Sequence, residues 1–189
     1  VDCGHTVAGA GDYDADGFAD IVIGDSDADL DEGGGGATLL FSGAGVSGTM
    51  DTLTEFDLRL VSLGYNEGGG AAVAPAGDVD GDGYDDIAMA SSSAWYNGYD
   101  PLEGWLHLWW GPPGGGVTEL ETTDADVQAD LGSYGNPVLA GGGDVDGDGL
   151  QDLAAGMVDH DSYDGGVAWV FTGPDLEAWA TVLGGTGDE

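Results

Sequence analysis

The sequence predicts an all-β protein made of three copies of one four-stranded antiparallel unit. An aspartate-rich pattern begins at Asp12, Asp78 and Asp144, so consecutive copies start 66 residues apart. Such a long fixed period indicates repeated supersecondary units. The chain also has 39 glycines in 189 residues. Because glycine in a helix interior costs about 1 kcal/mol, this composition disfavours helices.

Each unit contains four strand candidates in the same order. The first precedes the aspartates ("TVAGAG", "AVAPAG", "VLAGGG"), and the second follows them ("IVIG", "IAMA", "LAAG"). The third comes after a variable loop ("GATLLFSG", "GWLHLWWG", "GVAWVFTG"), and the fourth ends the unit ("FDLRLVSLG", "DVQADLG", "WATVLGG"). These segments are short, often rich in β-branched, leucine or aromatic residues, and bounded by glycine or aspartate, as strands are. None sustains a helical apolar period over ten or more residues.

Four-stranded units at regular spacing are typical of β-propeller blades, more than of an irregular β-sandwich. We expect blades at residues 1–64, 65–132 and 133–189. Propellers typically have four to eight blades, so three blades leave two open faces. We therefore expect a head-to-tail homodimer that closes a six-bladed ring. The alternative is that the chain is a piece of a longer propeller.

The chain is extremely acidic, with 37 acidic side chains against one basic side chain, Arg59, and a formal net charge of -36. This charge repels nucleic acid and anionic lipid, which excludes both as partners. With almost no internal counter-charge, the fold needs bound cations or salt screening. We therefore expect a saline or calcium-rich environment, extracellular or at the cell surface.

Other signals of location are weaker. Cys3 has no second cysteine to pair with inside the chain and is expected to be a small buried residue. No apolar run approaches the roughly 18 residues that span a bilayer, so membrane insertion is not expected. The chain opens with Val1 rather than methionine, which favours processing or excision upstream.

The aspartate pattern, D-x-D-x-D-G-x-x-D, predicts one Ca²⁺ site per unit. Two carboxylates about 5 Å apart repel by roughly 3 kcal/mol at an effective dielectric of 20, so the loop needs a cation. Ca²⁺ accepts six to eight oxygen ligands, and a glycine at position 6 permits the sharp turn. The predicted ligands are the carboxylates at positions 1, 3, 5 and 9 and the main-chain carbonyl at position 7: Asp12, Asp14, Asp16, Phe18 and Asp20; Asp78, Asp80, Asp82, Tyr84 and Asp86; Asp144, Asp146, Asp148, Leu150 and Asp152.

Two other interpretations of these loops are disfavoured. An EF-hand needs a glutamate at position 12 between flanking helices, but that position holds Ile23, Met89 or Ala155 and the flanks are strand-like. Merely solvated acidic turns would not explain three matching copies.

The loops and their flanks resemble the FG-GAP repeats of integrin alpha-chain β-propellers. The matching stretches are the three aspartate loops, the segments before them ("CGHTVAGAGD", "GGGAAVAPAGD", "YGNPVLAGGGD") and later strands such as "GGVAWVFTG". The resemblance covers nearly the whole chain. It implies a propeller whose calcium loop lies between the first and second strands of each blade, and a role in adhesion or ligand recognition.

The loops between the second and third strands are the candidate recognition surface, because they differ in each unit. Trp95, Tyr96 and Tyr99 form an aromatic cluster there that suits a sugar or a protein partner. A loop that packs its own aromatic side chains is equally compatible. The acidic residues of these loops are expected to be solvated rather than to bind more metal: Asp25, Asp27, Asp29 and Asp31; Asp159, His160, Asp161 and Asp164. The tryptophans at strand positions are expected in the core: Trp105, Trp109, Trp110 and Trp169.

No enzyme is expected. His5, His107 and His160 occupy unrelated places in the repeat, and no G-x-S-x-G or H-E-x-x-H motif occurs. The expected function is a calcium-binding, non-enzymatic module for extracellular recognition of protein or glycan. Two alternatives are a calcium-stiffened scaffold without a ligand and a propeller domain excised from a larger secreted hydrolase.

Overall fold

The computed structural model confirms the predicted all-β class. It describes residues 3–28, 35–50, 55–62, 67–92, 103–112, 119–133, 135–158, 166–173 and 177–184. These residues form three separate sheets and one short 3-10 turn, and they include no α-helix. Within these ranges there is no helix long and apolar enough to cross a membrane.

The sheets repeat one strand order. The first sheet contains β1 (Thr6–Gly11), β2 (Asp20–Asp25), β3 (Ala37–Phe41) and β4 (Leu58–Val61). The second contains β5 (Ala72–Gly77), β6 (Asp86–Ala90), β7 (Glu103–Trp109) and β9 (Val127–Ser133). The third contains β10 (Pro137–Gly143), β11 (Asp152–Met157), β12 (Val167–Thr172) and β13 (Glu177–Leu183). Within each sheet, these strands pair antiparallel with their neighbours in chain order.

The first sheet has a fifth strand that the sequence did not predict. This strand, β8 (Glu119–Glu121), comes from the connection between β7 and β9 and pairs parallel with β4. Arg59 on β4 donates hydrogen bonds from Nε and Nη2 to Glu119 Oε2. The turn η1 (Thr122–Asp124) then leads the chain back to β9 in the second sheet. The connection therefore ties the second sheet to the outer edge of the first.

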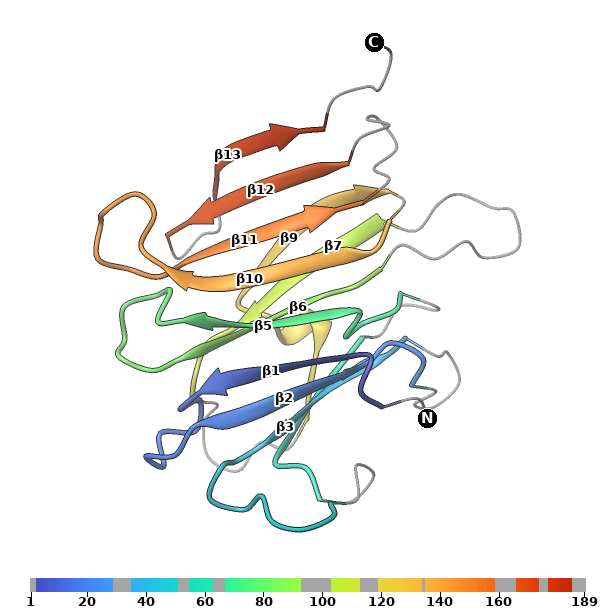
Figure 1. Cartoon of the computed structure of the whole chain (residues 1–189), viewed down its shortest axis with the longest axis vertical. Coiled ribbons are helices and arrows are strands. Elements are labelled where there is room, and N and C mark those ends of the chain that lie inside the picture. Colours follow the sequence, from blue (N-terminus) through green and yellow to red (C-terminus); the bar gives the residue numbers. More distant parts are fainter. Residues whose placement is uncertain are drawn as a thin grey trace.

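The sheets stack along the long axis of the molecule, with the first at the bottom and the third at the top of Figure 1. Their first strands β1, β5 and β10 lie side by side, with β5 in the middle. Glycines permit this approach: a Cβ added to Gly24 would lie 2.1 Å from the carbonyl oxygen of Gly70, and one on Gly141 would lie 2.0 Å from that of Pro75. Neighbouring sheets can pack closely because these positions carry no side chain.

Two apolar clusters fill the spaces between the sheets. The first joins β1–β4 to β5–β7 through residues such as Val22, Leu40, Ile87 and Trp109. The second joins β5, β6, β7 and β9 to β10–β12 through others, including Leu108, Leu153 and Phe171. Among the tryptophans expected in the core, Trp109 is fully buried, whereas the remaining three, Trp105, Trp110 and Trp169, are partly buried. Cys3 is also partly exposed, in contrast to the expected burial.

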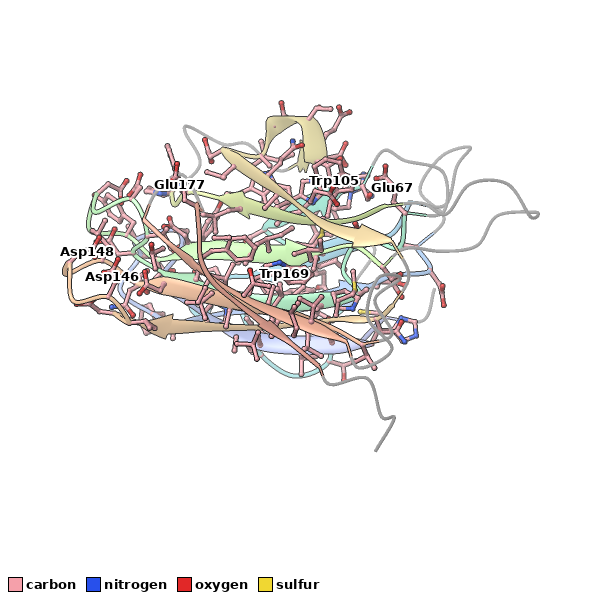
Figure 2. The ribbon with its side chains drawn as sticks, turned by 90° about the horizontal axis from the view of Figure 1, so that it is seen from above. Glu67, Trp105, Asp146, Asp148, Trp169 and Glu177 are labelled. Atoms are coloured by element: carbon pink, nitrogen blue, oxygen red, sulfur yellow. The ribbon has the colours of Figure 1, made fainter. Side chains whose placement is uncertain are left out.

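The three aspartate loops leave their sheets in the same way. Each first strand shifts register near its end, between Gly9 and Gly11, Pro75 and Gly77, or Gly141 and Gly143. A bulge of this kind bends a strand and re-aims the chain. All three loops project from one end of the molecule, at the left of Figure 1. Figure 2 shows Asp146 and Asp148 of the third loop at that end and Glu67 at the opposite end.

Candidate metal centres

Each aspartate loop brings three carboxylates together. The members are the aspartates at positions 1, 3 and 9 of the pattern, and within each group one oxygen from each residue lies within 4.8 Å of the others. The groups are Asp12, Asp14 and Asp20; Asp78, Asp80 and Asp86; and Asp144, Asp146 and Asp152. Three clusters of hard oxygen donors at equivalent places can each hold a metal ion, and such donors suit Ca²⁺ or Mg²⁺.

Main-chain amides fix the first carboxylate of each loop. The amide of the position 6 glycine donates to the position 1 aspartate: Gly17 to Asp12, Gly83 to Asp78 and Gly149 to Asp144, with N···O distances of 3.0 Å to the Oδ2 atom in each loop. These glycines have φ of +91°, +95° and +97°, which side-chain-bearing residues rarely adopt. Glycine is therefore favoured at position 6, as predicted, because the loop backbone has a positive φ there.

The position 9 aspartate connects the loop to the strands around it. Asp86 is fully buried; its Oδ2 accepts from the Val79 amide at 2.8 Å, and its Oδ1 accepts from the Gly111 amide at 3.0 Å. Asp20 makes the equivalent bonds to Tyr13 and Gly43. These bonds hold the third ligand in place before any ion binds.

The aspartates at position 5 lie outside the three clusters, although the sequence predicts them as ligands. Asp16, Asp82 and Asp148 each accept a hydrogen bond from the amide two residues later, at 2.8, 2.9 and 2.8 Å respectively. Asp16 Oδ2 also accepts from the Ser42 hydroxyl at 2.8 Å. Short aspartate side chains commonly bond the backbone two residues ahead.

Burial makes the clusters electrostatically unfavourable without a cation. Burial raises the pKa of Asp86 to about 7, against the hydrogen bonds from Val79 and Gly111 that lower it; it also raises the pKa values of Asp20 and Asp80. A cation beside these carboxylates would favour their ionised form. In the third loop, Asp152 Oδ1 is buried and accepts no hydrogen bond from the described residues. Raised carboxylate pKa values and an unsatisfied buried oxygen are what a cation site would relieve.

Sequence reasoning missed the residue at position 8, which links one loop to the next. Asp85 Oδ2 accepts from the Asp12 amide at 2.9 Å, so the second loop holds the backbone of the first. The main-chain amide of Gln151 donates to the main-chain carbonyl of Asp78 at 3.2 Å, so the third loop holds the second. The contact depends on the packing of two sheets, and position 8 is alanine, aspartate or glutamine in the three copies. No local pattern could have indicated it.

The predicted recognition residues Trp95, Tyr96 and Tyr99 lie outside the described residues, as do Asp29 and Asp31 and the segment 159–165. Asp25 and Asp27 are described. Asp25 is buried, and its Oδ1 has no hydrogen-bond partner among the described residues. Asp27 Oδ2 lies 3.9 Å from Nε2 of the exposed His5. Neither belongs to a cluster of three ligand side chains among the described residues.

Comparison with protein-family models and with curated proteins finds no match to this chain. The sites must therefore be interpreted from their own chemistry.

Proposed function

We propose that this chain is a calcium-binding, non-enzymatic module of β-propeller type, in which each sheet is one blade and each aspartate loop holds one Ca²⁺. The observation that carries the proposal is the threefold recurrence of the same carboxylate cluster at the same place in each sheet. The motif resemblance to FG-GAP repeats supports the same assignment.

Ca²⁺ fits these loops better than Mg²⁺. Each cluster supplies three carboxylates from one loop, and Ca²⁺ tolerates irregular geometry with six to eight oxygens. Mg²⁺ demands near-ideal octahedral geometry and keeps several waters, so all-protein cages suit it poorly. The position 5 carboxylates and the position 7 carbonyls are the proposed additional ligands.

Isothermal titration of the metal-free chain with Ca²⁺ tests this assignment. We expect about three ions per chain. Asp80→Ala should lower the count by one, because Asp80 belongs to the second cluster. Asp27→Ala is the matched control, because it removes an equal charge from an exposed side chain outside the clusters. Absence of binding, or an equal loss in both variants, would refute the assignment.

We further propose that ligand recognition uses the end of the sheets opposite the aspartate loops. The connections β2–β3, β6–β7 and β11–β12 leave the sheets at that end, because the second strand of each sheet runs away from its aspartate loop. They differ in length and sequence, whereas the aspartate loops are nearly constant. Variable loops on a constant scaffold are the usual arrangement of recognition surfaces.

A glycan and matrix-protein array, probed in millimolar Ca²⁺, would identify the ligand class. Binding that is lost in the Trp95→Ala and Tyr96→Ala double variant, with the melting temperature unchanged, would support recognition by the β6–β7 connection. Binding that persists in this variant would refute the role of that aromatic cluster.

A further inference from the structure

Two sheet faces at opposite ends of the stack match faces that are packed inside it. We call the face of a sheet that packs on the next sheet its trailing face; Val22 lies on it in the first sheet and Ala88 in the second. We call the face that packs on the preceding sheet its leading face; Ile87 lies on it in the second sheet and Leu153 in the third. Among the described strands, no sheet covers the trailing face of the third sheet or the leading face of the first (Figure 1).

The trailing face of the third sheet exposes side chains whose equivalents are buried. Position 2 of the aspartate loop shows this most directly: Tyr13 is 0% exposed, Val79 is 1% exposed and Val145 is 54% exposed. Tyr13 and Val79 each pack into the cluster between their own sheet and the next. Val138, the equivalent of the buried Ala72, is also largely exposed. The difference lies in what covers the sheet, since these residues are all apolar.

The leading face of the first sheet shows the complementary exposure. Ile21 is 39% exposed, whereas its equivalents Ile87 and Leu153 are 0% and 1% exposed. Val7 is largely exposed, and its equivalent Val73 is buried. The exposed part of this face is the β1–β2 half, because Leu39 and Phe41 on β3 are already buried.

A shallow hollow on the third sheet corresponds to a place on the first sheet that the backbone preceding β5 of the second sheet covers. On the first sheet, the Gly70 carbonyl rests against Gly24 and accepts a 3.0 Å hydrogen bond from the Thr6 hydroxyl. Gly156 and Val138 are the equivalents of Gly24 and Thr6, and they line a hollow of about 320 Å³ on the third sheet. One repeat before Gly70 stands Gly4, with φ of +100° against +81° for Gly70. Gly4 therefore shares the positive φ of Gly70, the residue whose carbonyl rests against Gly24.

We propose that a second copy of this chain covers both faces, with the leading face of each copy packed on the trailing face of the other. The contact would repeat the two packings already present inside the chain, in which Val22 shares a cluster with Ile87 and Ala88 shares one with Leu153. In the pair, Ala154 and Ile21 would take these places. Each interface is heterologous, and two of them close a two-fold ring. The pair has six sheets, within the four to eight of closed propellers.

Net charge sets the conditions under which the pair forms. Each copy carries -36, so association at low ionic strength works against strong repulsion. At roughly 1 M salt the Debye length is about 3 Å, and the apolar faces then meet without that opposition. The inference does not depend on calcium, because salt alone supplies the screening.

Size-exclusion chromatography with light scattering, at roughly 1 M NaCl with and without millimolar Ca²⁺, tests the pair. We expect a molar mass twice the 18.9 kDa of one chain that stays at this value as concentration rises. A monomer at every concentration would overturn the proposal. A mass that keeps growing would also overturn it, because it indicates open chains of copies.

Single substitutions on either face distinguish head-to-tail packing from a symmetric contact of one face with itself. Val138→Glu and Ile21→Glu should each give a monomer, since each places a carboxylate in both interfaces of the ring. Thr123→Glu, in the exposed η1 turn, adds the same charge away from both faces and should leave the pair intact. Circular dichroism checks that each variant is folded, which the exposure of both positions favours.

Mixing the two monomeric variants gives the sharpest result. The Val138→Glu copy keeps a native leading face, and the Ile21→Glu copy keeps a native trailing face. We expect the mixture to form a two-chain species through one intact interface, while neither variant does so alone. A pair that survives Ile21→Glu, or a mixture that stays monomeric, would overturn head-to-tail packing.

Discussion

The second and third aspartate loops share the sequence DVDGDG, at residues 78–83 and 144–149, yet they lie in different surroundings. In the second loop Val79 and Asp86 are buried, and Asp78 and Asp80 are partly buried. In the third loop Asp144, Val145 and Asp146 are exposed, although Asp152 remains buried. The second loop contacts the next sheet through Gln151, and no described strand occupies the corresponding position beside the third loop.

The comparison separates what the loop sequence determines from what its neighbour determines. The internal hydrogen bonds are the same in both loops, including the amide of the position 6 glycine to the position 1 aspartate. Burial differs between the two loops, and in the second loop it raises the pKa values of Asp80 and Asp86. Local sequence therefore gives the loop its shape, and the adjacent sheet gives it much of its electrostatic environment.

Calcium removal should have the largest effect, because it acts on what the loops have in common. A ligand at 100-fold its Kd adds about 2.7 kcal/mol per site, so three sites add roughly 8 kcal/mol to the free energy of unfolding. We expect EDTA to lower the melting temperature by more than about 10 °C, measured by calorimetry. Equal molar Mg²⁺ should restore little of this loss. An unchanged melting curve would argue against calcium in both loops.

The buried His107 on β7 should make the fold less stable in acid. Burial lowers the pKa of His107 to about 4 from 6.5, against a smaller opposing effect of Glu67. The unfolded chain then binds a proton that the native state excludes. The contribution of His107 to the free energy of unfolding is therefore full above pH 6.5 and is lost as the pH drops toward 4. The loss is on the order of 3 kcal/mol.

Denaturant unfolding of the parent and of His107→Gln across this pH range measures that contribution. We expect the variant to lose less stability between pH 6.5 and 4 than the parent. His5→Gln is the matched control, because it makes the same substitution at an exposed histidine. Parallel profiles for the parent and His107→Gln would contradict the prediction.

The valines at position 2 test the comparison directly. Val79→Ala removes two buried methyl groups and should lower the free energy of unfolding by about 2 kcal/mol. Val145→Ala makes the same change at an exposed site and should cost less than about 0.5 kcal/mol. Chemical denaturation at a protein concentration where the chain is monomeric makes the two values comparable. Equal costs under these conditions would mean that the third loop is covered within one chain.

The first loop differs from both others at position 4, and the effect there should be smallest. Ala15 has φ of +62°, where Gly81 and Gly147 stand in the other loops. An L-residue with a side chain is strained in this region, so Ala15→Gly should stabilise the fold by up to about 1 kcal/mol. Gly147→Ala should cost a similar amount, because the added Cβ meets no atom within 4 Å and only the backbone is affected. A loss of stability in Ala15→Gly would show that the backbone of Ala15 is not strained.

Local patterns were sufficient to predict the three sheets and the three carboxylate clusters. Strand segments are marked by their composition and flanking turns, and ligands of one loop are close in sequence, so both signals are short-ranged. The strand β8 was not predictable, because its three residues Glu119–Glu121 have no strand signature and pair with β4 about 60 positions earlier. The hydrogen bond from the Ser42 hydroxyl to Asp16 Oδ2 was not predictable either, because Ser42 follows the end of another strand. Both contacts form only when distant segments meet.

The contacts made by Asp85 and Gln151 have a consequence for how the loops respond to cations. Asp85 belongs to the second loop and holds the Asp12 amide of the first, and Gln151 belongs to the third loop and holds the Asp78 carbonyl of the second. A cation that orders one loop thereby restrains the residue that is hydrogen-bonded to the preceding loop. Neighbouring sites should therefore raise each other's affinity for the cation, and occupancy should rise more steeply with calcium concentration than it would for three independent sites.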